Sequence, residues 1–356
     1  MARDRIAAAL AAGLWTLPES GPIGLFRPRS DTDLSALPGD RLRAFVTWAP
    51  DAAGLAARGI AMAEPDAAGF AAAAVFATRA RVETLGLIAA ALARCRPGGA
   101  VLIDGRRGDG IDGLWRACRA ALGGSDSVTL GHGRAFALDR PETLPDLVAQ
   151  WATEAAPRRV AGGWLTRAGL FSADGPDPGS ALLGDRLHAP LGARVADLAA
   201  GWGYLAARAL AADPGIERLD LIEADANAVA CARENVTDPR ARFHWADATA
   251  WQGAGGYDSV LMNPPFHDGR AADPALGRAF IARAAQLLRP GGRLWLVANR
   301  QLPYEPALDA GFARHEILTA AHGFKVIRAE GPRAGPPRRG GRSRLDRPAA
   351  PARRRP

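Results

Sequence analysis

The second half of the chain alternates short apolar runs with helix-like runs. We predict strands over 193–199, 218–225, 242–247 and 257–263, with helices over 204–212 and 226–235. This alternation is typical of an α/β fold, in which a doubly wound parallel sheet carries helices on both faces. Ligands bind such folds at the carboxyl ends of the strands, so the residues that follow each strand are the candidates for function.

The first half repeats part of this pattern. A predicted helix over 82–94 precedes the stretch "RPGGAVLIDGRRGDG", and "RPGGRLWLVANR" at 289–300 follows a second predicted helix. The repeat indicates duplication of one α/β unit, although Pro-Gly-Gly is also a common turn between a helix and a strand. A length of 356 residues suits two domains, which we expect over 1–150 and 160–330.

The C-terminal end is strongly basic. Between residues 328 and 356, ten arginines stand against two acidic residues, which accounts for the net charge of +8 and leaves the rest nearly neutral. Residues 331–356 are rich in Arg, Pro and Gly, and we predict that they are disordered because they cannot bury enough apolar surface. Two interpretations stay open: a non-specific tether for RNA phosphates, or a solvated basic end.

Cysteine usage and hydropathy limit the possible locations. Cys95, Cys118 and Cys231 are far apart and form no CxxC pair, which argues against disulfides and against a zinc site. The chain begins with an apolar stretch too short for a signal peptide and has no run of about 18 apolar residues. We therefore expect a cytoplasmic protein without a metal or a membrane partner.

A glycine-containing turn follows the first predicted strand of the second half. Asp197 ends that strand, and Gly201 and Gly203 let the backbone turn sharply and approach a ligand closely. The stretch "GWGYLA" that begins at Gly201 also fits a dinucleotide-binding fingerprint, with Glu223 about 20 residues later as the ribose-binding acid. The turn alone does not distinguish between these ligands.

Acidic residues end the next two predicted strands. Glu223 is placed to accept hydrogen bonds from ribose hydroxyls, and Asp247 is placed to accept one from the exocyclic amine of adenine. Either acid would alternatively cap the helix or turn that follows it. Together the two positions favour an adenosine-containing ligand.

The fourth predicted strand ends in Asn263-Pro264-Pro265-Phe266. An exocyclic amine on a base is a poor nucleophile because its lone pair is delocalised into the ring. The Asn263 side-chain oxygen and the Pro264 carbonyl would accept both amine hydrogens and expose the lone pair, while Phe266 would stack on the base. The alternative is an ordinary strand-terminating turn.

These motifs resemble the class I S-adenosylmethionine-dependent methyltransferases that methylate nitrogen. More narrowly, four segments look like parts of the bacterial ribosomal RNA guanine-N2 methyltransferases, in particular the enzymes for 16S RNA. These segments are "FSADGPDPGSALL", "NPPFHDG", "VANRQLPY" and "HGFKVIRA". Enzymes of this group contain the domain called methyltransferase small. The resemblance implies tandem Rossmann-like domains, each with a seven-stranded, mostly parallel sheet and an antiparallel last strand. The N-terminal domain would be degenerate, the molecule a monomer, and the partner ribosomal RNA or the small ribosomal subunit.

The resemblance also implies residue roles. S-adenosylmethionine would lie with its methionine part along Asp197, Gly201 and Gly203, its ribose at Glu223 and its adenine at Asp247. Asn263 and Pro264 would hold the guanine N2 amine, with Phe266 against the ring. Ala199 departs from the family pattern, which usually has glycine there, and we expect the alanine to be tolerated.

Three other functions stay open. A related methyltransferase would modify a guanine in 23S RNA or a protein amide. A non-catalytic RNA-binding or ribosome assembly factor would result if Ala199 had abolished cofactor binding. The third is a nicotinamide oxidoreductase that uses the turn at Gly201. The absence of a catalytic tyrosine-lysine pair argues against this class, since the chain contains a single lysine, Lys325.

Overall fold

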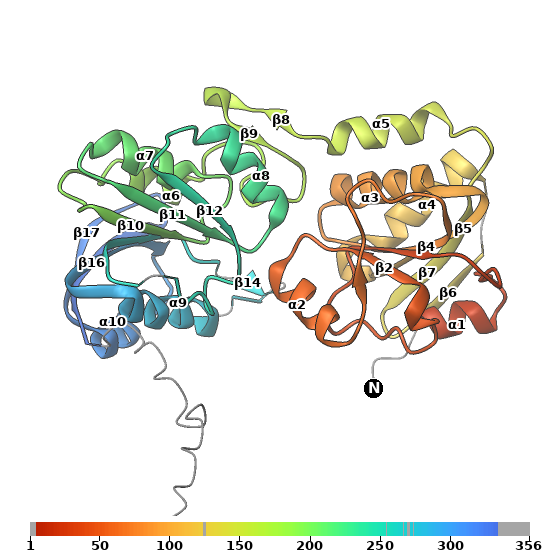
Figure 1. The fold of residues 1–356 in the computed structure, drawn as a ribbon, viewed down its shortest axis with the longest axis horizontal. Coiled ribbons are helices and arrows are strands. Elements are labelled where there is room, and N and C mark those ends of the chain that lie inside the picture. The colour runs from red at the N-terminus through yellow and green to blue at the C-terminus, as the bar shows by residue number, and fades with distance from the viewer. Residues whose placement is uncertain are drawn as a thin grey trace, which may run out of the picture.

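The protein consists of two lobes, each built on a seven-stranded sheet (Figure 1). The computed structural model describes residues 5–123, 126–253, 255–265, 267–268, 271–272 and 274–333. The prediction that disorder begins at residue 331 is wrong, because Gly331 and Pro332 are the last two residues of the strand Phe324–Pro332. Residues 334–356 of the predicted tail lie outside the described residues. No helix of the described part is long and apolar enough to cross a membrane.

The C-terminal lobe contains the predicted alternation of strands and helices. Its sheet has the strands β10 (Arg194–Leu198), β11 (Arg218–Glu223), β12 (Ala241–Trp245), β13 (Tyr257–Met262), β16 (Leu288–Asn299), β17 (Phe312–Ala321) and β18 (Phe324–Pro332). Its helices are α6 (Pro178–Gly184), α7 (Tyr204–Ala212), α8 (Ala226–Asn235), α9 (Pro274–Leu287) and α10 (Glu305–Gly311). The predicted helices over 204–212 and 226–235 are confirmed in full.

The N-terminal lobe is built in the same way. Its strands are β1 (Ile23–Phe26), β2 (Leu42–Phe45), β3 (Ala61–Met62), β4 (Phe70–Phe76), β5 (Cys95–Arg106), β6 (Ser127–Leu130) and β7 (Gly133–Asp139). Its helices are α1 (Arg5–Ala11), α2 (Ala49–Ala57), α3 (Arg81–Arg94), α4 (Ile111–Leu122) and α5 (Asp146–Ala155). Two short ribbons, β8 (Arg158–Arg159) with β9 (Leu165–Thr166) and β14 (His267–Asp268) with β15 (Ala271–Ala272), complete the described strands.

The two sheets have the same topology. The strand orders are β3-β2-β1-β4-β5-β7-β6 and β12-β11-β10-β13-β16-β18-β17. In each sheet one strand, β7 or β18, pairs antiparallel with both neighbours, and the other pairs are parallel. The predicted tandem α/β fold is thus confirmed, and the repeated Pro-Gly-Gly segments are the equivalent strands β5 and β16.

Each sheet is covered by apolar side chains on both faces. In the C-terminal lobe, Leu198 and Met262 belong to the core under α9 and α10, whereas Val195 and Leu261 belong to the core under α6 and α7. Strands buried on both faces read as continuous apolar runs, which explains why they stand out in the sequence.

The N-terminal lobe carries no glycine turn where the C-terminal lobe has one. After β10 come Ala199 to Gly203, but after the equivalent β1 come Arg27, Pro28 and Arg29. After β4, Ala77-Thr78-Arg79 stands at the position that Asn-Pro-Pro occupies after β13. The N-terminal lobe therefore has the fold without the ligand motifs.

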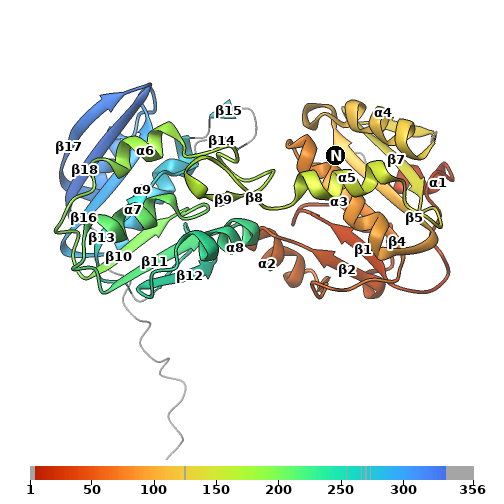
Figure 2. The same ribbon diagram turned by 90° about the horizontal axis from the view of Figure 1, so that it is seen from above.

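The lobes meet at one end of each sheet, where α2 lies close to α8 (Figure 2). Ala49 N donates to Ala224 O at 2.8 Å, and Ala226 N donates to Thr47 O at 2.8 Å. The loop before α2 thus pairs with the loop that follows β11. On another side of the molecule, α5 and the β8-β9 ribbon form the covalent connection (Figure 1).

Candidate active site

The sheet register brings the predicted site residues to one edge. Leu198, at the end of β10, is paired with Ile222 of β11 and with Met262 of β13. Because these strands are parallel, the residues that follow them meet at the carboxyl edge. Ala199, Glu223 and Asn263 are therefore neighbours, although 64 positions separate the first from the last.

The glycine turn lies against this edge in a left-handed backbone conformation. Gly201 has φ of 55° and Gly203 has φ of 92°. A Cβ atom on Gly203 would come within 2.8 Å of Val236 Cγ2, so this glycine is needed for space as well as for φ. A Cβ atom on Gly201 would meet nothing within 4 Å, because Gly201 lines a pocket.

Ala199 adopts the conformation for which the family pattern supplies glycine. Its φ is 58°, and it lines the same pocket as Gly201. A left-handed conformation costs an L-residue about 1–2 kcal/mol. Ser172 lines the pocket from the opposite segment with φ of 52°, so two non-glycine residues hold strained backbone at this site.

Glu223 links the glycine turn to the next strand. Its Oε2 accepts from Gly201 N at 2.8 Å, and its Oε1 accepts from Asp225 N at 2.8 Å. Burial raises the pKa of this carboxyl, while the hydrogen bonds from Asp225 and Gly201 oppose the rise. Each oxygen retains a lone pair, so the side chain still has capacity to accept from a hydroxyl.

Asp197 is a fully buried carboxyl group at the same edge. Neither of its oxygens has a hydrogen-bond partner of ordinary geometry within the described part of the chain, although the backbone N–H of Ala206 is near enough to lower its pKa. Burial, and then the neighbouring charge of Glu223, raises its pKa to about 8. A buried acid without a partner is costly to maintain, and a cationic ligand such as the ammonium of a methionine moiety would relieve that cost.

Asp247 follows β12 and forms part of a turn. Its Oδ1 accepts from Thr249 N at 2.8 Å and from Thr249 Oγ1 at 2.7 Å. One oxygen of Asp247 therefore stabilises a turn, which is the alternative role that the sequence analysis gave for this acid. The pocket beside Asn263 is lined by other residues, so Asp247 belongs at most to a more distant part of a ligand site.

Asn263 faces the glycine turn across the pocket. Its Nδ2 donates to Asp177 Oδ2 at 2.9 Å and to Ser180 Oγ at 2.8 Å. A carboxylate can only accept, so the nitrogen of the amide must face Asp177 and the Oδ1 atom is left for another donor. Pro264 is buried, and Phe266 lies outside the described residues.

The far wall of the pocket comes from the segment before α6 and from the first turn of that helix. Phe171, Ser172, Asp177 and Ser180 line it, and the Phe171 carbonyl accepts from Trp202 Nε1 at 3.0 Å. Phe171 is 56% exposed, so an aromatic ring stands open at the mouth of the pocket.

Asp177 and Ser180 were not among the residues predicted for the site. Aspartate followed by Pro178 is a typical helix start, and Asp177 Oδ2 indeed accepts from Ser180 N at 2.8 Å. The start of α6 was thus readable from the sequence. Its contact with Asn263, 86 residues away, was not.

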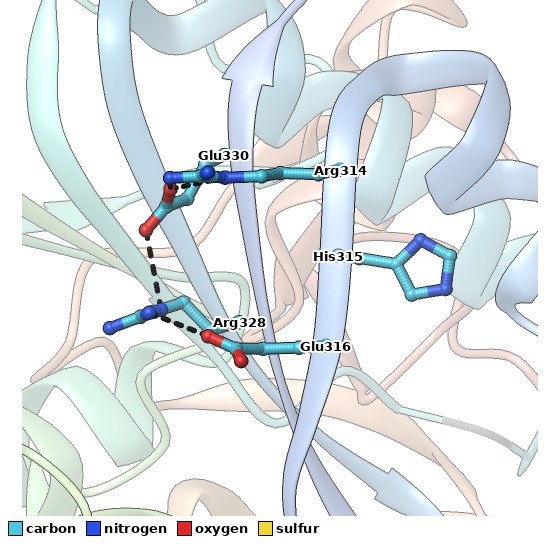
Figure 3. A pocket seen from close by; sticks show the side chains of 5 residues that line it. All are labelled: Arg314, His315, Glu316, Arg328 and Glu330. Carbon is cyan, nitrogen blue, oxygen red and sulfur yellow. Dashed lines mark hydrogen bonds and ion pairs between the residues drawn. The ribbon is translucent and has the colours of Figure 1, made fainter.

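A second depression lies on β17 and β18, away from this edge. Figure 3 shows that Arg314, Arg328, Glu316 and Glu330 point toward one another, whereas His315 points away. Arg314 Nε donates to Glu330 Oε2 at 2.8 Å, and Arg328 Nη2 donates to Glu316 Oε1 at 2.5 Å. Opposite charges pair here between the edge strand β17 and its neighbour β18, and charged side chains on an edge strand discourage edge-to-edge association.

Comparison with known proteins identifies the C-terminal lobe. The model of the methyltransferase small domain matches residues 163–328. The "Ribosomal RNA small subunit methyltransferase C" of Sodalis glossinidius is 36% identical over 165 residues, which is 46% of this chain and 47% of that protein. The "Ribosomal RNA large subunit methyltransferase G" of Streptomyces coelicolor is 36% identical over 169 residues, covering 46% of this chain and 45% of that protein.

The chain spans about half the length of the curated relatives it matches. A solved structure, the T. thermophilus 16S rRNA N2 G1207 methyltransferase in complex with AdoMet and guanosine, extends the similarity to both lobes. It is 25% identical with a TM-score of 0.72, over 89% of this chain and 90% of that one. Residues 163–328 thus match the methyltransferase small domain, in agreement with the resemblance to class I methyltransferases.

Proposed function

We propose that this protein transfers a methyl group from S-adenosylmethionine to the exocyclic N2 amine of a guanine in ribosomal RNA, most specifically 16S RNA. The observation that carries the proposal is Asn263, whose amide nitrogen is held by Asp177 and Ser180 and whose oxygen is left for a substrate amine beside the glycine turn. The small-subunit relatives and the solved guanosine complex of the T. thermophilus protein support the choice of base.

In this proposal the cofactor supplies an electrophilic methyl group. Asp197, with Gly201 and Gly203, would hold its methionine part, because the unpartnered carboxyl is suited to an ammonium. Glu223 would accept from its ribose and Asp247 from its adenine through the oxygen that the turn does not use.

The protein's part in the chemistry is positioning. Asn263 Oδ1 and the Pro264 carbonyl would accept the two amine hydrogens, so that the nitrogen lone pair is exposed toward the methyl group. Phe266 would stack on the guanine. A general base is not required, because the amine proton can leave to water after methylation.

The remaining parts would serve the RNA. We propose that residues 1–150 form a degenerate domain without a cofactor and that the arginine-rich residues after β18, which ends at Pro332, are a tether for RNA phosphates. A ribosomal substrate would place the protein in the cytoplasm, where it would act as a monomer.

The test is tritium transfer from labelled S-adenosylmethionine to 30S and 50S particles from a strain that lacks the enzyme. We expect 2-methylguanosine in 16S RNA, abolished by Asn263→Ala and retained in Gln150→Ala, which removes an amide from the exposed face of α5. Product in 23S RNA would instead favour the activity named for the Streptomyces relative. No transfer, together with no cofactor binding, would favour a non-catalytic RNA-binding factor.

A further inference from the structure

Asp177 has one carboxylate oxygen engaged and one available. Its Oδ2 accepts from Ser180 N at 2.8 Å and from Asn263 Nδ2 at 2.9 Å. Its Oδ1 accepts no hydrogen bond from the described residues, and Asp177 lines the same pocket as Asn263. Asp177 Oδ1 and Asn263 Oδ1 are thus two acceptors on hydrogen-bonded side chains that line the same pocket.

The bases differ in what they offer to such a pair of acceptors. Guanine carries a ring N1–H next to its exocyclic amine. Adenine and cytosine carry an amine next to a ring nitrogen with a lone pair, and uracil has a ring N–H but no amine. An amine beside a ring N–H thus occurs in guanine alone among the four, and it matches two neighbouring acceptors.

We infer that Asp177 selects guanine, by accepting the N1–H at Oδ1 while its Oδ2 fixes the Asn263 amide with the oxygen toward the N2 amine. The inference rests on the proposed function for the identity of the base. For adenine or cytosine, the carboxylate would face a lone pair, and one buried acceptor would repel another. Asp177 would thereby exclude bases that the Asn263 acceptor alone cannot distinguish.

The substitution Asp177→Asn replaces one hydrogen-bond acceptor at this position with a donor. Asparagine is as good an N-cap as aspartate, so α6 should keep its start. Ser180 N and Asn263 Nδ2 are both donors, so they require the oxygen of the new amide. Its NH2 group must then replace Asp177 Oδ1 and face the N1 position of the base.

The experiment measures nucleoside binding by calorimetry to the full-length protein saturated with S-adenosylhomocysteine. Guanosine offers both N1–H and the amine, inosine offers only N1–H, and 2-aminopurine riboside offers only the amine beside an N1 lone pair. We expect the wild-type protein to bind guanosine at least about 10-fold more tightly than 2-aminopurine riboside, because the latter loses a charge-assisted hydrogen bond. This comparison does not depend on how any variant folds.

In Asp177→Asn, guanosine should bind more weakly and 2-aminopurine riboside more tightly, so that the preference shrinks or reverses. The control Asn263→Ala should weaken guanosine and leave inosine nearly unchanged, because inosine has no amine to lose. A variant that lowers affinity for all three nucleosides by the same factor would show a merely structural role and overturn the inference.

Wild-type protein that binds guanosine and 2-aminopurine riboside equally, or that binds no guanosine, would also overturn it. These outcomes are separable from the proposed function. If the protein methylates guanine in RNA but does not bind guanosine selectively, only the inference about Asp177 is wrong. If the protein binds guanosine selectively but transfers no methyl group to either ribosomal particle, the proposed activity is wrong and the inference about guanine recognition stands.

Discussion

Ala199 has a backbone conformation that glycine adopts without steric cost. Its φ of 58° costs an L-residue about 1–2 kcal/mol, whereas glycine would add about 0.5–1 kcal/mol of unfolded-state entropy. We predict that Ala199→Gly raises the free energy of unfolding by up to about 1 kcal/mol, measured in urea. The control Ala200→Gly, at a position without positive φ, should lower it. Equal effects of the two substitutions would contradict strain at Ala199.

Asp197 links cofactor binding to pH. Its pKa of about 8 in the free protein lies above that of an unfolded aspartate, so the folded chain holds an extra proton between about pH 4 and 8. Stability from this group is therefore highest below about pH 4, falls as the pH rises from about 4, and is lost once the pH has passed about 8. A bound ammonium would favour the ionised form, so binding should release a proton below pH 8.

We predict that S-adenosylmethionine binds more tightly as the pH rises from 6 to 8. Calorimetry at pH 6.5 in two buffers of different ionisation enthalpy should show release of close to one proton. In Asp197→Asn this buffer dependence should disappear along with most of the affinity. Identical heats for the wild-type protein in both buffers would show that the carboxyl is already ionised.

At the scale of single elements, the packing of α9 against the start of α10 is close. A Cβ atom on Gly277 of α9 would come within 1.9 Å of the hydroxyl oxygen of the fully buried Tyr304. We predict that Gly277→Ala lowers the free energy of unfolding by about 1–3 kcal/mol, because one of the two elements must shift. Denaturant unfolding measures the change.

Gly311 provides the matched control for this element. It ends α10, and a Cβ atom there would lie 3.5 Å from Ala285 Cβ, an ordinary contact with the same helix α9. Gly311→Ala should be neutral or slightly stabilising. A loss equal to that of Gly277→Ala would contradict the assignment of that loss to the contact with Tyr304, because alanine is the better helix former at both positions.

For the whole molecule, the N-terminal lobe touches the loop that orients a predicted cofactor residue. Arg27 Nη1 lies 3.4 Å from Asp225 Oδ2, and the backbone N–H of Asp225 holds Glu223 Oε1. Trp245 Nε1 also donates to Thr47 O at 2.8 Å across the same contact. The N-terminal lobe thus restrains the geometry of Glu223 without touching the pocket beside Asn263.

We predict that Arg27→Ala weakens S-adenosylmethionine binding by about 3- to 10-fold, because a partly buried ion pair that restrains the Glu223 loop is lost. Arg29→Ala, in the same loop, removes an arginine whose ion pair among the described residues is with exposed Asp31, and it should leave affinity unchanged. Titration calorimetry on full-length variants measures both. Equal affinity of all three proteins would show that the two lobes act independently at this loop.

Local signals in the sequence were sufficient for the strands and helices that were predicted in the C-terminal lobe. Strands buried on both faces read as apolar runs, and Gly203 and Asp225 mark helix starts through backbone geometry and side-chain capping. The alternation of such elements fixed the α/β class, and the repeated Pro-Gly-Gly segments indicated two copies. Because ligands bind at the carboxyl ends of parallel strands, this class also predicted Asp197, Glu223 and Asn263 as site residues.

The tertiary structure decided which of these side chains act together. Asp177 caps a short helix in any fold, and only the packing of α6 against the end of β13 brings its carboxylate to Asn263. The contact of the N-terminal lobe with the Glu223 loop was equally absent from any local pattern. The sequence determined the helices and strands because capping and burial act over a few residues. The orientation of the Asn263 amide, the unpartnered carboxyl of Asp197 and the contact between the lobes were decided by the tertiary structure. Each of them depends on groups that only the folded chain brings together.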